Sequence, residues 1–261
     1  MAAPAPNPRV PFGIAFEDDD LLIAVKDRGV VTRPGQGHDR DSLMNGLVAR
    51  EGQRLLDLGE RRDYGLLHRL DRATSGLVAV ARTPLAYDRL REAFAGRRVE
   101  KVYLAVVRPA PPRPAGTVRV RLKETRRQDH KVAIVDARGE EAITHWKTLA
   151  TGRDGRAIVA CRIETGRLHQ IRAHLAWLGS PLASDAVYAG PRAPDGRGSS
   201  ARAADREILL HAWRLRFPHP RSGAPLSVDA PPPDAWAEET RGLGTSLAAI
   251  LRRADEPRAR R

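Results

Sequence analysis

Short apolar runs alternate with polar turns along most of the chain, and this pattern predicts a series of β-strands. The runs are rich in Val, Ile and Leu, and Gly, Pro, Asp or Arg residues separate them. The predicted strands are Leu21–Val25, Leu77–Ala81, Val102–Val107, Val132–Val135, Ala142–Leu149, Ala157–Ile163 and Ile208–Leu215. Several of these strands follow one another without an intervening helix, so a purely parallel sheet is a poor fit.

Apolar positions at helical spacing predict three helices between the strands. The first begins at Asp41-Ser42, and the second runs from the N-cap Thr83 to Gly96. The third covers residues 166–178 and stops before Gly179. This combination predicts an α+β fold, with a mixed, mainly antiparallel sheet and flanking helices.

The distribution of Pro, Gly and Arg predicts one folded domain with loose ends. Residues 1–11 are rich in Pro and Ala and are expected to form a flexible arm. Residues 12–235 are expected to form the domain, and residues 236–261 a basic tail. Inside the domain, residues 190–205 are rich in Gly, Pro, Ser and Arg and predict a mobile loop.

The net charge is the feature of the composition that says most about the binding partner. The 261 residues include 45 Lys and Arg against 32 Asp and Glu, a net charge of +13, which favours a polyanionic partner. A hydrophobic fraction of 41% supplies a core and excludes a wholly disordered chain. Aromatic residues make up only 5%, so rows of stacking rings are not the expected mode of binding. The abundance of Ala and Arg is typical of GC-rich bacterial coding.

Cysteine usage and the length of the apolar runs indicate a cytoplasmic protein. Cys161 is the only cysteine, which excludes a disulfide within the chain and a cysteine-based metal site. No apolar stretch reaches the roughly 20 residues that span a bilayer, and the first residues lack the pattern of a secretory signal. Gly35-x-Gly37 lacks the remaining glycines of a dinucleotide-binding fingerprint, so no nucleotide cofactor is expected.

The densest cluster of polar residues is His68–Leu77, with the sequence HRLDRATSGL. Asp71 lies between Arg69 and Arg72, and the neighbouring positive charge is expected to keep its carboxylate ionised. An ionised carboxylate in a dry pocket acts as a nucleophile or as a general base. For an isolated Arg-x-Asp, an exposed ion pair at the start of a strand is the simpler interpretation.

A second dense segment, Thr165–His174, has the sequence TGRLHQIRAH and opens the third predicted helix. Its polar residues include Arg167, His169, Gln170 and Arg172. Helix N-termini favour anions, so the segment is suited to binding a phosphate. His169 and His174 are five residues apart and do not share one helix face, so no metal site is expected.

These segments together resemble the RluA family of RNA pseudouridine synthases. The His68–Leu77 segment matches the whole HRLDxxTSGL signature of the family. The other similar stretches are the opening FEDDDLLIAVKDRGVV, the K-x-Y element Lys101-Val102-Tyr103, the block Thr165–Tyr188, and the late elements Leu210-His211-Ala212 and Phe217-Pro218-His219-Pro220. The resemblance covers roughly residues 12–230, in the family's order. By itself, Lys101-Val102-Tyr103 would indicate only a half-buried tyrosine beside a surface lysine.

The sequence departs from the family pattern at two places outside the expected catalytic set. Lys26-Asp27-Arg28-Gly29 stands where the family usually has Lys-Pro-x-Gly, and Ser184-Asp185 stands where it usually has Gly-Asp. Some members carry an S4 RNA-binding domain before the catalytic part. Too few residues precede Phe12 to encode one, so the chain resembles the short, single-domain form.

The resemblance implies an enzyme that isomerises uridine in RNA to pseudouridine. The family breaks the N1–C1′ bond, turns the base and joins C5 to C1′, without a cofactor or a metal. The expected partner is a stem-loop of rRNA or tRNA, because a base costs less to flip from a loop than from a duplex. No membrane partner is expected, and the expected oligomeric state is a monomer.

The resemblance also implies a role for each site residue. Asp71 matches the catalytic Asp, which either attacks C1′ or removes the ribose 2′ proton, and the sequence leaves both routes open. Arg172 matches the arginine paired with that Asp, and Tyr103 matches the tyrosine that stacks on the target base. Arg69 matches the residue that enters the space left by the flipped base. The other residues expected to bind substrate are His68, Arg72, Thr74, Arg167, His169 and Gln170.

Two other functions remain open on the sequence. A catalytically silent RNA-binding or ribosome-assembly protein would not need Asp71, Tyr103 and Arg172 together. A hydrolase acting through a carboxylate would need a second acid, for which Glu164 is the nearby candidate. The basic segment Arg113–Lys131 is the candidate phosphate-binding surface, and a merely solvated pair of strands is the alternative.

Overall fold

The chain divides into two compact units. The computed structural model describes residues 3–127, 130–188 and 208–255. The first unit comprises Met1–Lys101 and His211–Pro231, and the second comprises Val102–Leu210 and Pro232–Arg261. Each unit is therefore built from two separate stretches of chain.

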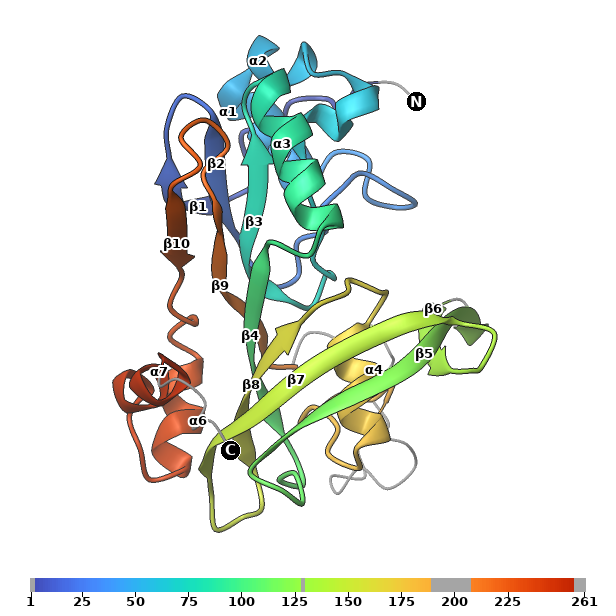
Figure 1. The fold of residues 1–261 in the computed structure, drawn as a ribbon, viewed down its shortest axis with the longest axis vertical. Coiled ribbons are helices and arrows are strands. Elements are labelled where there is room, and N and C mark those ends of the chain that lie inside the picture. The colour runs from blue at the N-terminus through green and yellow to red at the C-terminus, as the bar shows by residue number, and fades with distance from the viewer. Residues whose placement is uncertain (1–2, 128–129, 189–207, 256–261) are drawn as a thin grey trace. The chain divides into compact units, whose positions relative to one another are not determined.

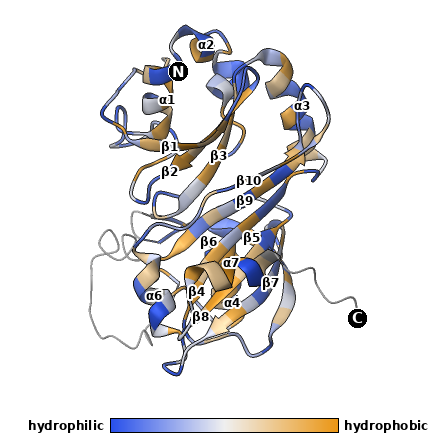
Figure 2. Cartoon of the chain, turned by 90° about the vertical axis from the view of Figure 1, so that its left-hand side faces the viewer, coloured by the Kyte–Doolittle hydropathy of each residue, from blue (hydrophilic) through white to orange (hydrophobic). Residues whose placement is uncertain are grey.

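Five of the described strands belong to the first unit. They are β1 (Phe12–Glu17), β2 (Leu21–Lys26), β3 (Ser75–Ala81), β9 (Leu210–Pro218), whose first residue belongs to the second unit, and β10 (Pro225–Asp229). The order is β1-β2-β3-β9, and β10 pairs with β9. The pairs are antiparallel except that β3 and β9 run parallel. The side chains of β2 and β3 are almost all buried, and both strands carry mostly hydrophobic colours in Figure 2.

The helices of the first unit begin where the sequence supplies capping residues. The helical segments are α1 (Leu43–Glu51), α2 (Gln53–Leu56), the 3-10 helix η1 (Glu60–Gly65) and α3 (Pro84–Ala95). The Ser42 side chain accepts a hydrogen bond from the amide of Asn45, and the Thr83 side chain accepts one from the amide of Ala86. The two predicted helix starts are therefore confirmed. Figure 1 shows α3 beside β3, against which it packs.

Apolar packing between α3 and the strands holds β3 in place. The buried cluster includes Leu21 of β2, Leu77 and Ala79 of β3, and Leu90 of α3. Burying a side chain of leucine size contributes about 1.5–3 kcal/mol. Because β3 begins four residues after Asp71, this core fixes the point at which the Asp71 loop enters the sheet.

The second unit contains the other five described strands in the order β4-β8-β7-β5-β6. They are β4 (Glu100–Val107), whose first two residues belong to the first unit, β5 (Ala115–Arg127), β6 (His130–Val135), β7 (Glu140–Thr151) and β8 (Ala157–Ile163). The pairs β5–β6, β5–β7 and β7–β8 are antiparallel. Helix α4 (Gln170–Trp177) packs against β6 and β7 (Figure 1).

Some element boundaries differ from those predicted, for local reasons. Residues 115–127 form the long strand β5, because apolar Val118 and Leu122 point inward between the charges. The sequence indicates a basic stretch here, with a solvated pair of strands as the alternative. The third helix starts at Gln170 and not at residue 166, since His169 adopts a left-handed conformation with φ 49°.

Both ends expected to be loose make contacts with the units. In the expected arm, the Asn7 amide donates to the carbonyl of Asn45 over 3.0 Å. Residues 236–255, expected as part of a basic tail, form α6 (Trp236–Gly242) and α7 (Leu247–Asp255) instead. Trp236 and Ile250 are buried, and α7 packs on β7. These apolar side chains explain why the segment folds back although it is rich in arginine.

The architecture is α+β, as predicted, with a mixed and mainly antiparallel strand pairing and flanking helices. The loop predicted at residues 190–205 lies outside the described residues. Among the helices that the structure describes, none has the length and apolar character needed to cross a membrane.

Candidate active site

The Asp71 loop lies directly before β3 and closes on itself by a turn. The amide of Thr74 donates to the carbonyl oxygen of Asp71 over 3.0 Å. Asp71 and Arg72 are half-buried, Arg69 is exposed and Thr74 is buried. The loop therefore presents the acid at the edge of the core, with one arginine reaching solvent beside it.

Lys26 lies buried behind this loop, at the end of β2. Its ammonium group donates to the carbonyl oxygens of Asp27 (2.8 Å), Val30 (2.7 Å) and Arg72 (3.4 Å). Burial lowers the pKa of Lys26 to about 7, while the charges of Asp71 and Asp27 act to raise it. Sequence reasoning noted this residue only as part of a family departure. Its position at the polar end of a fully apolar run was the available clue.

The signature glycine brings two distant sequence blocks together. Gly76 of β3 has φ 111° and pairs with Ala212 of β9, and a Cβ at Gly76 would lie 2.3 Å from the Ala212 carbonyl oxygen. Beside this contact, Ser75 Oγ lies 2.9 Å from Nδ1 of the buried His211. The His211 Nε2 atom is 2.9 Å from the carbonyl oxygen of Ala230. The T-S-G and L-H-A elements therefore meet as neighbouring strands that anchor the Asp71 loop.

His68 fixes the other end of the loop as a neutral ring. Its Nε2 accepts a hydrogen bond from the amide of Ala79 over 3.1 Å, and its ring centroid lies 5.3 Å from that of Phe94. Burial lowers the pKa of His68 to about 3, and the charge of Lys101 adds to the shift. Burial also lowers the pKa of Lys101 to about 8, with its ammonium 5.7 Å from the Phe94 ring centre. The contact of His68 with substrate stays a prediction.

In the second unit, Arg172 is locked by an ion pair inside the protein. Its Nε and Nη2 atoms donate to the two carboxylate oxygens of Asp185 over 2.8 and 2.9 Å. The two side chains are only 1% and 0% exposed. Arg172 Nη1 lies 3.5 Å from Nε2 of His169, and the guanidinium sits 5.2 Å from the ring centre of Tyr188. A bidentate pair of this kind fixes both the position and the orientation of the guanidinium.

The segment around Asp185 explains one of the family departures. Asp185 Oδ1 also accepts hydrogen bonds from the amides of Val187 and Tyr188 over 3.1 and 3.3 Å. Ser184, which stands where the family usually has glycine, has φ 63°. A glycine adopts this left-handed conformation without the clash that a Cβ causes, so the backbone keeps the geometry that the usual residue favours.

Gln170 is a structural residue of the second unit. Its Oε1 accepts from the Thr165 hydroxyl (2.7 Å) and the Arg167 amide (3.1 Å), and its Nε2 donates to the Ile143 carbonyl and the Thr144 hydroxyl, both over 3.0 Å. These contacts tie the start of α4 to β7. Contact of Gln170 with RNA stays a prediction, and the side chain is only 3% exposed.

The other predicted residues of the second unit lie in different settings. Tyr103 is buried in β4, and exposed Arg167 pairs with Glu140. Glu164, the second acid that a hydrolase would need, has Oε1 2.6 Å from Nε2 of His145. Its carboxylate is therefore engaged by an imidazole, which does not favour the hydrolase alternative.

The predicted residues thus fall into two groups. The first unit brings together His68, Arg69, Asp71, Arg72 and Thr74 within one loop. The second unit carries Tyr103, Arg167, His169, Gln170 and Arg172. The pairing of Asp71 with Arg172 joins residues of different units and stays a prediction.

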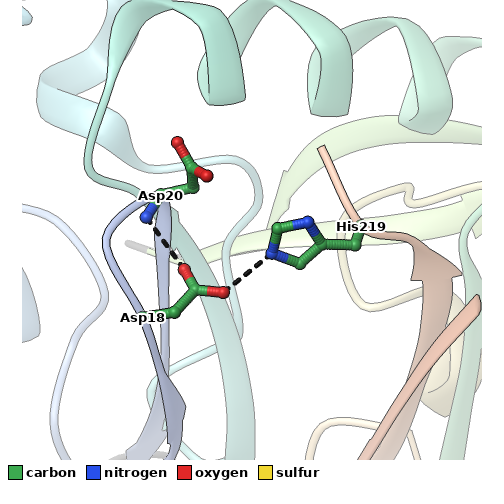
Figure 3. Close-up of side chains that lie close together, drawn as sticks. All are labelled: Asp18, Asp20 and His219. Atoms are coloured by element: carbon green, nitrogen blue, oxygen red, sulfur yellow. Dashed lines mark hydrogen bonds and ion pairs between the residues drawn. The ribbon is translucent and has the colours of Figure 1, made fainter. Parts of the chain in front are cut away.

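A cluster of two acids and a histidine lies elsewhere in the first unit (Figure 3). Ligand-type atoms of Asp18, Asp20 and His219 lie within 4.8 Å of one another. Asp18 accepts from the amide of Asp20 over 2.8 Å, and its other oxygen is 2.7 Å from His219 Nε2. The guanidinium of Arg221 bonds both oxygens of Asp20. Both carboxylates of the cluster are therefore already engaged by side chains of the β9–β10 turn, and the cluster ties the β1–β2 turn to that turn.

A row of cations follows one face of β5 in the second unit. Arg119, Arg121, Lys123 and Arg127 occupy alternating positions, and the three arginines are exposed. Arg119 Nη1 lies 2.8 Å from a carboxylate oxygen of Glu141. The row gives the predicted basic segment a defined surface.

Comparison with known proteins decides the family. The family model described as RNA pseudouridylate synthase matches residues 20–177, which include Asp71, Tyr103 and Arg172. The chain is also 38% identical over 229 residues to the ribosomal large subunit pseudouridine synthase D of Xanthomonas campestris, covering 86% of this chain and 67% of that protein. The chain belongs to the RNA pseudouridylate synthase family.

The chain is also similar in sequence and in fold to other pseudouridine synthases. The ribosomal large subunit pseudouridine synthase D of Neisseria meningitidis serogroup A is 36% identical over 85% of this chain. The chain spans 58% of the length of that relative. The structure of the human RNA pseudouridylate synthase domain containing 1 covers 95% of this chain, with a TM-score of 0.67 and 23% identity. The predicted family and the α+β fold of a pseudouridylate synthase are therefore confirmed.

Proposed function

We propose that the chain is an RNA pseudouridine synthase that isomerises selected uridines of structured RNA, with Asp71 as its catalytic carboxylate. The observation that carries the proposal is the complete HRLDxxTSGL signature. His68 at its start is bonded to β3, and its end runs into β3 where that strand pairs with β9. A protein that only binds RNA has no need of an acid held in this way. Membership in the family supports the same reaction class.

The reaction is an isomerisation within one nucleotide, so it balances without another reactant. The N1–C1′ bond of uridine breaks, the base turns, and C5 bonds to C1′. The proton on C5 is lost, and N1 gains one. Asp71 serves either by attacking C1′ or by taking the ribose 2′ proton, and both routes need its carboxylate ionised and close to the sugar.

The residues of the second unit complete the proposed mechanism. Tyr103 offers an aromatic face on which the flipped uracil stacks and a hydroxyl placed to assist loss of the C5 proton. Arg172 is the cationic partner proposed for Asp71. Its buried pairing with Asp185 holds that charge in one orientation.

Structured ribosomal RNA is the substrate that we propose to test first. Two similar relatives are named for the ribosomal large subunit, and transfer RNA is the other class considered. The net charge of +13 and the cation row of β5 support binding to phosphates. Such an enzyme would work in the cytoplasm, where its RNA is found.

The test is pseudouridine mapping across all cellular RNA in a strain that lacks the gene. The strain is complemented with the wild-type chain, with Asp71→Asn, or with Asp88→Asn as a matched control. Asp88 is an exposed acid of α3 in the same unit, paired with Arg62 over 3.0 Å. We expect one or a few pseudouridines to disappear, and to return with wild type and Asp88→Asn but not with Asp71→Asn.

Two results of the mapping experiment would contradict the proposal. Return of the sites with Asp71→Asn would contradict the catalytic role of this carboxylate. A map unchanged by loss of the gene would favour a binding protein on the same fold. Purified Asp71→Asn should still bind RNA that contains the affected site, because the amide keeps the size of the carboxylate.

A further inference from the structure

The side chain of Thr32 contacts the backbone of Leu70, the residue directly before Asp71. Its hydroxyl donates to the carbonyl oxygen of Leu70 over 2.7 Å and accepts from the amide of Leu70 over 3.0 Å. Thr32 is 3% exposed and Leu70 is 4% exposed. One hydroxyl therefore satisfies both backbone polar groups of a buried residue, where water does not replace it.

Thr32 is itself fixed to the first turn of α1. The amide of Leu43 donates to the carbonyl of Val31 over 2.8 Å, and the amide of Met44 donates to the carbonyl of Thr32 over 3.2 Å. These donors belong to the start of a helix, where backbone amides lack partners within the helix. The position of Thr32 is thus set by α1, and its hydroxyl transmits that position to Leu70.

Arg72, the residue directly after Asp71, is held by residues of the segment that contains Thr32. The carbonyl of Arg72 accepts from the amide of Gly29 over 2.7 Å and from the ammonium of Lys26 over 3.4 Å. Residues 26–32 thus form hydrogen bonds with the backbone of the residue before Asp71 and of the residue after it. None of these hydrogen bonds uses the carboxylate of Asp71, so they position the residue without occupying its carboxylate oxygens.

We propose that Thr32 is a positioning residue for the reaction of Asp71, acting through the Leu70 peptide. The inference rests on the proposed function, because it assigns Thr32 a part in the reaction proposed for Asp71. The hydroxyl holds the backbone of the acid at the distance and angle that attack or proton removal requires. Reacting groups tolerate little displacement, since a shift of about 1 Å costs up to about 100-fold in rate.

The test compares three substitutions of Thr32 in the full chain. Thr32→Val keeps the shape and removes both hydrogen bonds, Thr32→Ser keeps the hydroxyl, and Thr32→Cys keeps a weak donor and acceptor. The substrate is a short RNA containing the uridine identified by mapping, and kcat and KM are measured separately. Thermal unfolding of each variant accompanies the kinetics.

We expect Thr32→Val to lower kcat by about 10- to 100-fold while KM changes by less than about threefold. Thr32→Ser should stay within about threefold of wild type in kcat, and Thr32→Cys should lie between Ser and Val. Ile250→Ala is the stability control, because Ile250 is a buried residue of α7 in the second unit, where α7 packs on β7. It should lower the unfolding temperature and leave kcat unchanged at a temperature where it is folded.

Several results would overturn the inference. Wild-type kcat in folded Thr32→Val would do so, and so would an equal loss in Thr32→Ser and Thr32→Val. If Thr32→Val does not fold, equal kcat in Thr32→Ser and Thr32→Cys is the result that decides against it. Asp71→Asn is measured beside them: turnover there removes the proposed function itself, whereas an inactive Asp71→Asn with an active Thr32→Val removes only the role of Thr32.

Discussion

Asp71 and Arg172 are held in opposite ways. In the first unit, the hydrogen bonds described for the Asp71 loop use backbone groups and the side chains of other residues, and the carboxylate of Asp71 takes part in none of them. In the second unit, the guanidinium of Arg172 is itself the anchor, since it forms a buried bidentate pair with Asp185. The difference fits the proposed roles: a group that reacts must keep its own atoms available, whereas a group that supplies charge gains from being locked.

The same chemical change should therefore have opposite consequences in the two regions. Asp185→Asn leaves the buried guanidinium of Arg172 without its counter-charge, and breaking such a pair costs about 3–5 kcal/mol. Asp71→Asn should change the unfolding free energy by less than about 1 kcal/mol while abolishing turnover. Urea unfolding of both variants, followed by tryptophan fluorescence, measures the contrast.

An equal loss of stability in the two variants would break this comparison. It would mean that Asp71 is as deeply integrated into the packing as Asp185. A double variant, Arg172→Met with Asp185→Asn, tests the charge pair by itself, because the Asn oxygen still accepts from the amides of Val187 and Tyr188. Removing the guanidinium as well should recover part of the stability lost by Asp185→Asn.

Acid should affect the Asp71 loop through His68. The ring accepts a hydrogen bond from Ala79 in its neutral form, and its pKa of about 3 lies below the ordinary value of 6.5. The unfolded chain therefore takes up the proton first. This contribution to stability is complete above pH 6.5 and is lost as the pH falls towards 3, at up to about 1.4 kcal/mol per pH unit.

The measurement is the unfolding free energy of wild type and His68→Gln between about pH 7.5 and pH 5. The variant has no group to protonate at this position, so its disadvantage should shrink as the pH falls. A gap that stays constant over the range would show that His68 does not titrate as the loop geometry requires.

The smallest effect is expected next to Asp185, at Ser184. A non-glycine residue in the left-handed region costs about 1–2 kcal/mol, and a glycine there loses about 0.5–1 kcal/mol more chain entropy on folding. Ser184→Gly should therefore stabilise the protein by about 0.5–1 kcal/mol, seen as a small rise in unfolding temperature, with kcat unchanged. A loss of stability would mean that the serine side chain contributes more than the strain costs.

Local chemistry made much of the fold predictable. Ser42 and Thr83 mark helix starts through capping that depends on residues only three positions away. The runs that became β2 and β3 are apolar throughout, as strands buried on both faces must be. Strand β5 was predicted in only one of the two interpretations of the basic segment, because its charged face dominates the composition and conceals the two inward apolar residues.

The site was predictable as a set of residues but not as a set of contacts. The roles of Thr32, Lys26 and Asp185 depend on partners brought near by folding, and among them only Lys26, at the polar end of an apolar run, carries a local sign. Thr32, for example, meets a peptide 38 residues away. The left-handed conformation of His169, which shortens α4, likewise depends on the fit of the whole segment around Gln170.

The parallel contact between β3 and β9 has a consequence for synthesis on the ribosome. Ser75 precedes its partner His211 by 136 residues. At about 5–20 residues per second, roughly 7–27 s pass between the appearance of the two strands. During that interval β3, which follows the Asp71 loop, has an unpaired edge. The apolar residues beside this edge are not yet covered by β9. Translation speed between these two points therefore sets how long an incomplete sheet is exposed to chaperones and proteases.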